Sequence, residues 1–241
     1  MKSMKLMAVL LSGTLILSGC NMSNTAKGGL IGGGAGAAVG GVLGSIIGNG
    51  KGAVIGAAIG TAVGAGAGVL IGNRMDKAKK AAEALESAKA EVLQDENGTA
   101  YVRVTFDSGI LFGTGQATLS EGAKSDLAKF ATSVLGENQD MDVAIVGYTD
   151  NQGWKNATAE QSQQKNQQLS EKRAQAVNTY LVGQMSKAGL SSAQIKSVVG
   201  KGEANPVADN NTAEGRKQNR RVEVFLVASQ AMVDKANAEA K

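Results

Sequence analysis

The chain has 241 residues and a formal net charge of +4, with no histidine and a single cysteine. This composition excludes Ser-His-Asp and Cys-His catalytic arrangements, histidine-bearing metal sites and disulfides within the chain. The small positive excess does not indicate a nucleic-acid surface, and we expect no metal and no cofactor.

The N-terminus has the pattern of a secretory signal peptide over residues 1–19. Lys2 and Lys5 form a short positive region, an apolar stretch covers residues 6–17, and small residues follow it. The apolar stretch is too short for a membrane span, so we expect the segment to be removed during export.

The end of this signal, LSGC at residues 17–20, resembles the bacterial lipobox. The resemblance implies cleavage before Cys20 and acylation of its sulfur and of its new amine. Two or more acyl chains anchor a protein durably, so we expect residues 20–27 to be a lipidated linker. Asn21, in place of the aspartate that implies inner-membrane retention, favours the outer membrane. An ordinary signal peptide with a chance cysteine is the alternative.

Residues 28–72 have a glycine at every fourth position, separated mainly by Ala, Val, Ile and Leu. Such a row lies along one ridge of a helix and lets two helices approach closely. The Asn-Gly-Lys turn signal at residues 49–51 divides the segment into arms 28–48 and 52–72, each about 31 Å long as a helix. That length matches a bilayer core. The segment resembles a glycine zipper, and we expect a membrane hairpin; a flexible linker is the alternative.

Residues 74–96 are charged and alanine-rich and contain no proline. This composition favours an exposed helix. We therefore expect residues 73–98 to form a helical spacer that ends at Asn97-Gly98.

Beyond the spacer, predicted strands alternate with predicted helices over residues 99–228. Helices are expected from the N-cap Ser120 to Gly136, from the N-cap Ser170 to about residue 187, and over 212–219. This alternation predicts an α/β (α+β) fold, a four-stranded mixed sheet with helices on one face, followed by a polar tail over 229–241. The strands are expected at 101–106, 141–149, 195–202 and 221–227.

Arg173 continues the apolar stripe of the second predicted helix, since the residues four, eight and twelve positions later are all apolar. An arginine on a core-facing stripe needs an acidic partner or a ligand. With Ser170 as N-cap it also lies in the first turn, where the helix dipole disfavours a cation. Asp150 ends the preceding strand at the same edge of the layer, so we expect the two side chains to converge. A structural ion pair without a ligand is the alternative.

Three motifs over about residues 99–228 resemble the C-terminal domain of the outer-membrane protein A family. The resemblance implies non-covalent binding of peptidoglycan through meso-diaminopimelate, with Asp150 and Arg173 at the family's acid and arginine positions. The ammonium and carboxylate of a diaminopimelate head each then meet an opposite charge. The motifs are GYTD (147–150), NxxLSxxRA (166–174) and NRRVE (219–223).

The resemblance implies further pocket residues. Asn166 is expected to hydrogen-bond the stem peptide, Gln152 to line the pocket, and Arg220 and Asp107 to be weaker candidates. Residues 154–165 are longer than the usual family spacing, and they bring the single tryptophan of the chain beside the expected pocket.

These segments together predict an outer-membrane lipoprotein, anchored through Cys20, whose periplasmic C-terminal domain binds peptidoglycan and tethers the membrane to the wall. Self-association through the zipper is a further expectation. The alternative function is an oligomeric zipper assembly that remodels or permeabilises membrane, with wall binding secondary. The missing histidine and the absence of a paired-carboxylate motif argue against an enzyme.

Overall fold

The computed structural model describes residues 65–94 and 100–240. The predicted signal peptide, the predicted lipidation site Cys20 and residues 28–64 of the predicted hairpin lie outside this part of the chain. Within the described residues, no helix combines the length and the hydropathy of a membrane span.

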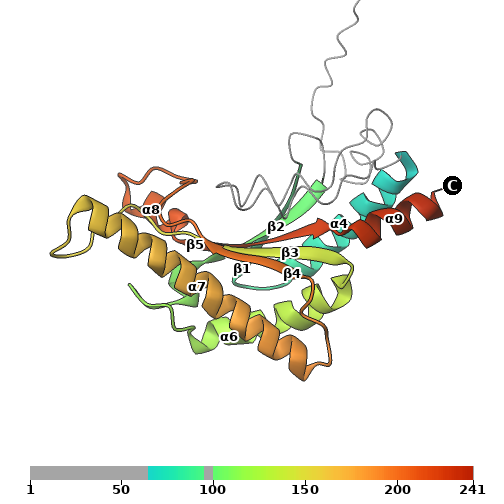
Figure 1. The fold of residues 1–241 in the computed structure, drawn as a ribbon, viewed down its shortest axis with the longest axis horizontal. Helices are drawn as coiled ribbons and strands as arrows, with labels where there is room; N and C mark the ends of the chain where they lie inside the picture. Colours follow the sequence, from blue (N-terminus) through green and yellow to red (C-terminus); the bar gives the residue numbers. More distant parts are fainter. Residues whose placement is uncertain (1–64, 95–99, 241) are drawn as a thin grey trace, which may run out of the picture.

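The fold is built on a five-stranded mixed sheet with the strand order β1-β2-β5-β3-β4 (Figure 1). β3 and β4 are parallel, and the other neighbouring strands are antiparallel. The predicted mixed α/β class is confirmed, and the four predicted strands correspond to β2–β5. The strands are β1 (Ala88–Gln94), β2 (Ala100–Asp107), β3 (Met141–Gly147), β4 (Ile195–Gly200) and β5 (Arg221–Ala228).

The sheet has five strands and not the predicted four. The additional strand is β1, which lies in the second half of residues 73–98, where a helical spacer was predicted. Ala88–Gln94 pairs with β2 along its whole length. Ala90 packs into the core on one face, while Glu91 on the other face forms an ion pair of 2.6 Å with Arg103 of β2. Cross-strand pairing of this kind overrides a helical propensity that is only a weak prior.

The boundary between the predicted hairpin and the predicted spacer also differs from the structure. One continuous helix, α4 (Ala65–Glu83), runs through residue 72. Ala67, Ile71 and Met75 of this helix are buried in the core of the domain. Residues 65–72, the last part of the predicted second arm, therefore belong to the globular domain, because their apolar side chains pack into the core of that domain.

Helices cover one face of the sheet. α6 (Glu121–Lys129) and α7 (Ala159–Lys187) lie on the same side of it (Figure 1), and they share one buried apolar core with α4 and the central strands. The predicted N-cap Ser120 is confirmed, since its side chain accepts a hydrogen bond from the Ala123 amide. The remaining helices are α5 (Ser108–Leu111), the π-helical η1 (Phe130–Leu135), the 3₁₀ turn η2 (Gly136–Asn138), α8 (Ala213–Asn219) and α9 (Gln230–Glu239).

The predicted polar tail is wrong, because residues 230–239 form α9 and pack against α4. Ser229 caps the helix by accepting a hydrogen bond from the Met232 amide. Met232, Val233 and Ala236 are buried. These three apolar residues at helical spacing are enough to dock an otherwise polar helix onto the domain.

The predicted start of α7 at Ser170 is wrong. The helix begins eleven residues earlier, at Ala159. Thr158 is the N-cap, and it forms a capping box with Gln161. Residues 159–168 contain neither proline nor glycine, so the helix continues without a break. Arg173 consequently lies in the middle of a helix, and the expected conflict with a helix N-terminus does not exist.

Candidate functional site

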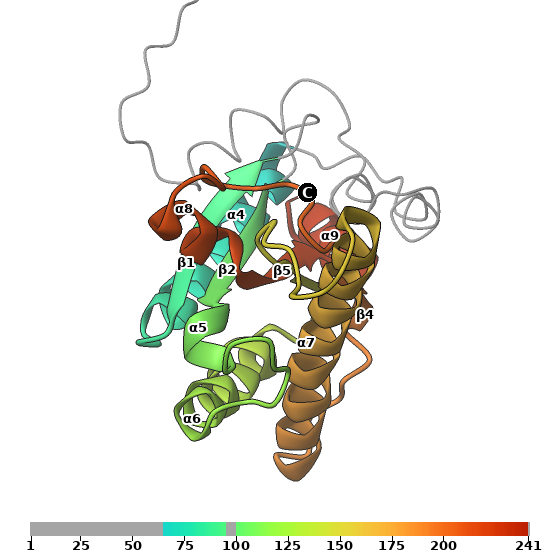
Figure 2. The ribbon, with the colours of Figure 1, turned by 90° about the vertical axis from the view of Figure 1, so that its left-hand side faces the viewer.

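A cavity of about 590 Å³ lies beyond the ends of β3 and β5, between the loop that follows α5 and the N-terminal half of α7. Figure 2 looks onto this end of the molecule, with α5 and α8 on the left and α7 on the right. The cavity brings together five of the six predicted ligand-binding residues, from segments far apart in the sequence. They are Asp150, Gln152, Asn166, Arg173 and Arg220.

Asp150 stands just beyond the end of β3 and is only 7% exposed. Its Oδ1 accepts a hydrogen bond from the backbone amide of Gln152 at 3.1 Å, and its Oδ2 accepts one from Arg220 Nη1 at 2.5 Å. The direct partner of the Asp150 carboxylate is thus Arg220, not Arg173 as expected. Asp150 and Arg173 nevertheless line the same cavity.

Arg173 is 3% exposed on the buried face of α7. Its guanidinium donates to the carbonyl oxygens of Gln116 at 2.9 Å and Gly113 at 3.5 Å, and it lies 5.2 Å from the centre of the Phe112 ring. Burial and, to a lesser extent, the charge of Arg220 lower the pKa of Arg173, Asp150 opposes the shift, and the resulting pKa is about 10. The group remains charged at neutral pH, yet none of its direct hydrogen-bond partners is a carboxylate.

The cavity holds two guanidinium groups and one carboxylate close together, so its inner charges leave one positive charge uncompensated. Arg173 is held by burial and by carbonyl acceptors, whereas the side chain of Arg220 is 36% exposed and is paired with Asp150. Arginine binds carboxylates through parallel N–H···O bonds, and Asp150 offers an acceptor for an ammonium group. The arrangement therefore suits a ligand that carries an ammonium and a carboxylate next to each other.

Asn166 supports the site from α7 and is 3% exposed. Its amide nitrogen lies 3.2 Å from both the Gln152 carbonyl and Glu203 Oε2, and 3.4 Å from the Asp150 carbonyl. Its oxygen accepts a hydrogen bond from Trp154 Nε1 at 2.8 Å. The hydrogen-bonding groups of Asn166 are therefore used within the protein, and they hold the loop that carries Asp150. Sequence reasoning did not identify Glu203, because no motif links it to the cavity.

The inserted residues 154–165 form one turn and the first two turns of α7, and they add one wall to the cavity. The Trp154 amide donates to Ser162 Oγ at 3.0 Å, and its indole lies against the ammonium of Lys165, 5.8 Å from the ring centre. Held at its backbone and at its ring nitrogen, Trp154 is a fixed aromatic surface at the rim.

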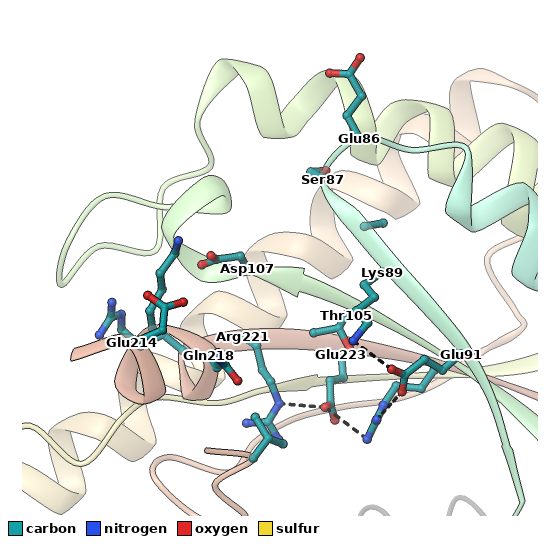
Figure 3. Close-up of a pocket in the computed structure, with 15 residues that line it drawn as sticks. Glu86, Ser87, Lys89, Glu91, Thr105, Asp107, Glu214, Gln218, Arg221 and Glu223 are labelled. Atoms are coloured by element: carbon teal, nitrogen blue, oxygen red, sulfur yellow. Dashed lines mark hydrogen bonds and ion pairs between the residues drawn. The ribbon is translucent and has the colours of Figure 1, made fainter. Parts of the chain in front are cut away.

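Asp107 and Arg221 lie outside this cavity. Asp107 caps α5 by accepting a hydrogen bond of 2.6 Å from the Gly109 amide, and it lines a second cavity (Figure 3). Arg221 is buried, pairs with Glu223 at 2.8 Å and stacks 3.8 Å from the centre of the Tyr148 ring. Of the two adjacent arginines, Arg220 thus faces the candidate site, and Arg221 is buried against Glu223 and Tyr148.

Changing Asn166 to aspartate is expected to destabilise the domain by about 3 kcal/mol at neutral pH, because a buried carboxylate then faces Glu203 and two carbonyl oxygens. Burial raises the folded-state pKa of the new carboxyl above the unfolded value, so the loss should shrink as the pH falls from 7 and should be largely gone near pH 4. Urea unfolding at pH 7 and pH 4 measures both effects.

Gln163→Glu is the matched control, because Gln163 Nε2 also binds Glu203, at 3.3 Å, but at an exposed position. We expect this change to cost less than about 1 kcal/mol, as is usual for exposed charges. Equal losses for the two variants would contradict a buried role for Asn166.

Two protein families match this chain. Residues 111–220 match the OmpA family, and residues 1–76 match the YMGG-like Gly-zipper family. The chain therefore carries an OmpA family domain behind a glycine-zipper segment, as its motifs predict. The OmpA family is not an enzyme family. Within residues 65–94 and 100–240, no three cysteine or acidic side chains are close enough to hold a metal ion.

Known relatives include the "Outer-membrane lipoprotein YfiB" of Pseudomonas aeruginosa, 36% identical over 50% of this chain, and the "Peptidoglycan-binding protein ArfA" of Mycobacterium bovis, 39% identical over 48%. The chain spans 64% and 32% of the lengths of these two proteins. A solved structure of a putative MotB-like protein from Desulfovibrio vulgaris aligns over 65% of this chain and 88% of its own, with 26% identity and a TM-score of 0.49.

Proposed function

We propose that this chain is an outer-membrane lipoprotein whose OmpA family domain binds peptidoglycan non-covalently, through the meso-diaminopimelate of the stem peptide. The observation that carries this proposal is the single cavity that contains Asp150, Arg173 and Arg220. The similarity of the chain to an outer-membrane lipoprotein and to a peptidoglycan-binding protein supports it. Binding of this kind needs no reaction, so the role is that of a structural tether.

Recognition follows from the charges of the cavity. The ammonium of the diaminopimelate head binds the Asp150 carboxylate, and the neighbouring carboxylate binds the buried guanidinium of Arg173. Without ligand, Arg220 is paired with Asp150; when the ligand binds, its partly exposed side chain turns from Asp150 to the same ligand carboxylate. The ligand thereby supplies Arg173 with the anion that the protein itself does not bond to it directly.

Attachment to the membrane is the second part of the proposal. Lipid on Cys20 and the zipper over residues 28–64 hold the chain in the outer membrane, and the domain faces the periplasm. Many weak contacts between two parallel surfaces act together, so each domain needs only modest affinity for the wall. Self-association through the zipper would add to this avidity.

A lysine-containing stem peptide is the natural competitor, because its side chain ends in an amine without the carboxylate. Binding it would leave the Arg173 charge buried without an anion, which costs binding free energy. We expect a stem tripeptide ending in meso-diaminopimelate to bind at least about tenfold more tightly than the same tripeptide ending in lysine. Isothermal titration calorimetry on the full chain in detergent measures both affinities.

Changing Asp150 to asparagine keeps the shape of the side chain and removes its charge. We expect the diaminopimelate tripeptide to bind roughly tenfold to a hundredfold more weakly, and less protein to sediment with isolated sacculi. Asp234→Asn, at an exposed site on α9 far along the chain from the cavity, is the matched control and should bind like the wild type. Wild-type binding by the Asp150 variant would reject this cavity as the ligand site.

A further inference from the structure

A second cavity, of about 640 Å³, lies on the face of the sheet opposite to α6 and α7 (Figure 3). Along β2, Val104 and Phe106 point into the helix-covered core, whereas Arg103, Thr105 and Asp107 point into this cavity. α8 forms its other wall. Apart from Ala88 and Val207, its lining residues are polar or charged, and of the residues proposed to contact diaminopimelate it includes only Arg220.

The floor of the second cavity is a chain of paired charges across three neighbouring strands (Figure 3). Lys89 binds Glu91 at 3.2 Å, and Glu91 binds Arg103 at 2.6 Å. Arg103 lies 3.9 Å from Glu223, which binds Arg221 at 2.8 Å. The lining of the whole cavity carries five basic and five acidic side chains, so the cavity has no net charge to attract an ion of either sign.

Several hydrogen-bonding groups around this floor remain unused within the described part of the chain. The Thr105 hydroxyl projects from β2, and the side chains of Glu214, Lys217 and Gln218 project from α8. They include donors and acceptors at separate points. A neutral ligand with many hydroxyl and amide groups satisfies such a surface, because each hydroxyl both donates and accepts. A sugar bearing acetamido groups has this chemistry.

The two cavities meet at Arg220, which lines both of them. In peptidoglycan, the stem peptide that carries diaminopimelate is joined to an amino sugar through two intervening residues. Two residues span roughly 7 Å when extended, which suits subsites that share one side chain as a wall. We propose that the second cavity binds the amino-sugar end of the ligand whose diaminopimelate occupies the first cavity. This inference rests on the proposed function.

The test compares two probes on the full chain in detergent: the diaminopimelate tripeptide alone, and the same tripeptide attached to its N-acetylglucosamine–N-acetylmuramic acid disaccharide. We expect the wild type to bind the disaccharide tripeptide about tenfold more tightly. The double variant Thr105→Val, Gln218→Ala should lose this preference to within about twofold, while its affinity for the tripeptide alone stays unchanged.

Thr179→Val with Gln175→Ala is the matched control, because it makes the same chemical changes on the outer face of α7, outside both cavities. It should keep the tenfold preference. Equal affinity of the wild type for both probes would overturn the second subsite and leave the proposed function intact. Weaker binding of both probes by the Thr105/Gln218 variant would also overturn the second subsite. Failure of both probes to bind the wild type would overturn it and would reject the proposed function as well.

Discussion

Replacing Arg173 with methionine is expected to weaken binding of the diaminopimelate tripeptide by about a hundredfold or more, while the domain stays as stable as the wild type or becomes more stable. Loss of one partner from a desolvated charge pair typically costs about 2–5 kcal/mol of binding free energy. The ligand carboxylate would then enter the cavity with only the partly exposed Arg220 to receive it.

The expected gain in stability has a separate physical reason. The folded protein keeps the Arg173 charge 3% exposed and bonded only to carbonyl oxygens. Burial lowers the pKa of Arg173 to about 10, so the charged form is less favourable in the folded chain than in the unfolded chain. Methionine fills a similar volume without the charge, and such replacements are often neutral or stabilising by about 1–4 kcal/mol. Two carbonyl oxygens lose a donor, which reduces the gain.

Calorimetric titration and urea unfolding of the same protein samples measure the two effects of Arg173→Met. Lys172→Met is the matched control, since it removes a cation from the neighbouring, exposed position of α7 and should change neither quantity appreciably. Arg173→Lys should bind with intermediate affinity, because an ammonium keeps the charge and loses the bidentate geometry. A large loss of stability in Arg173→Met would instead identify Arg173 as an anchor for the loop at residues 113–116.

Changing Gly147 to alanine is expected to destabilise the domain by about 3 kcal/mol or more. A Cβ atom at Gly147 would lie 2.3 Å from the Ser170 carbonyl oxygen and 3.1 Å from its carbonyl carbon. Because these are backbone atoms of α7, no side-chain rotation can relieve the contact. The helix must move away from β3, and Arg173 moves with it, so ligand binding should fall as well.

Gly183→Ala is the control within the same helix, since a Cβ atom there meets nothing within 4 Å. Alanine is favoured over glycine inside a helix by up to about 1 kcal/mol, so this variant should be neutral or slightly more stable. Urea unfolding of both variants decides the matter. If Gly147→Ala unfolded at the wild-type urea concentration, the close contact between β3 and α7 would be ruled out.

Much of the secondary structure of the domain can be predicted from short stretches of sequence. The four strands β2–β5 show alternating or continuous apolar patterns, and the cap at Ser120 and the short helix α8 have local signals. The four-residue spacing that puts Arg173 on a core-facing stripe requires only the period of a helix. The early start of α7 also has a local signal, the capping-box pair Thr158 and Gln161.

Other features depend on contacts between segments distant in the chain. β1 is a strand because β2 offers it a partner, and α9 is ordered because α4 offers it an apolar surface. Asp150 pairs with Arg220 instead of Arg173 because β5 brings Arg220 to the same edge of the sheet. Periodicity and capping arise among residues a few positions apart, so a linear sequence displays them. The partner of a buried charge is set by which strands are neighbours, and that becomes visible only once the chain has folded.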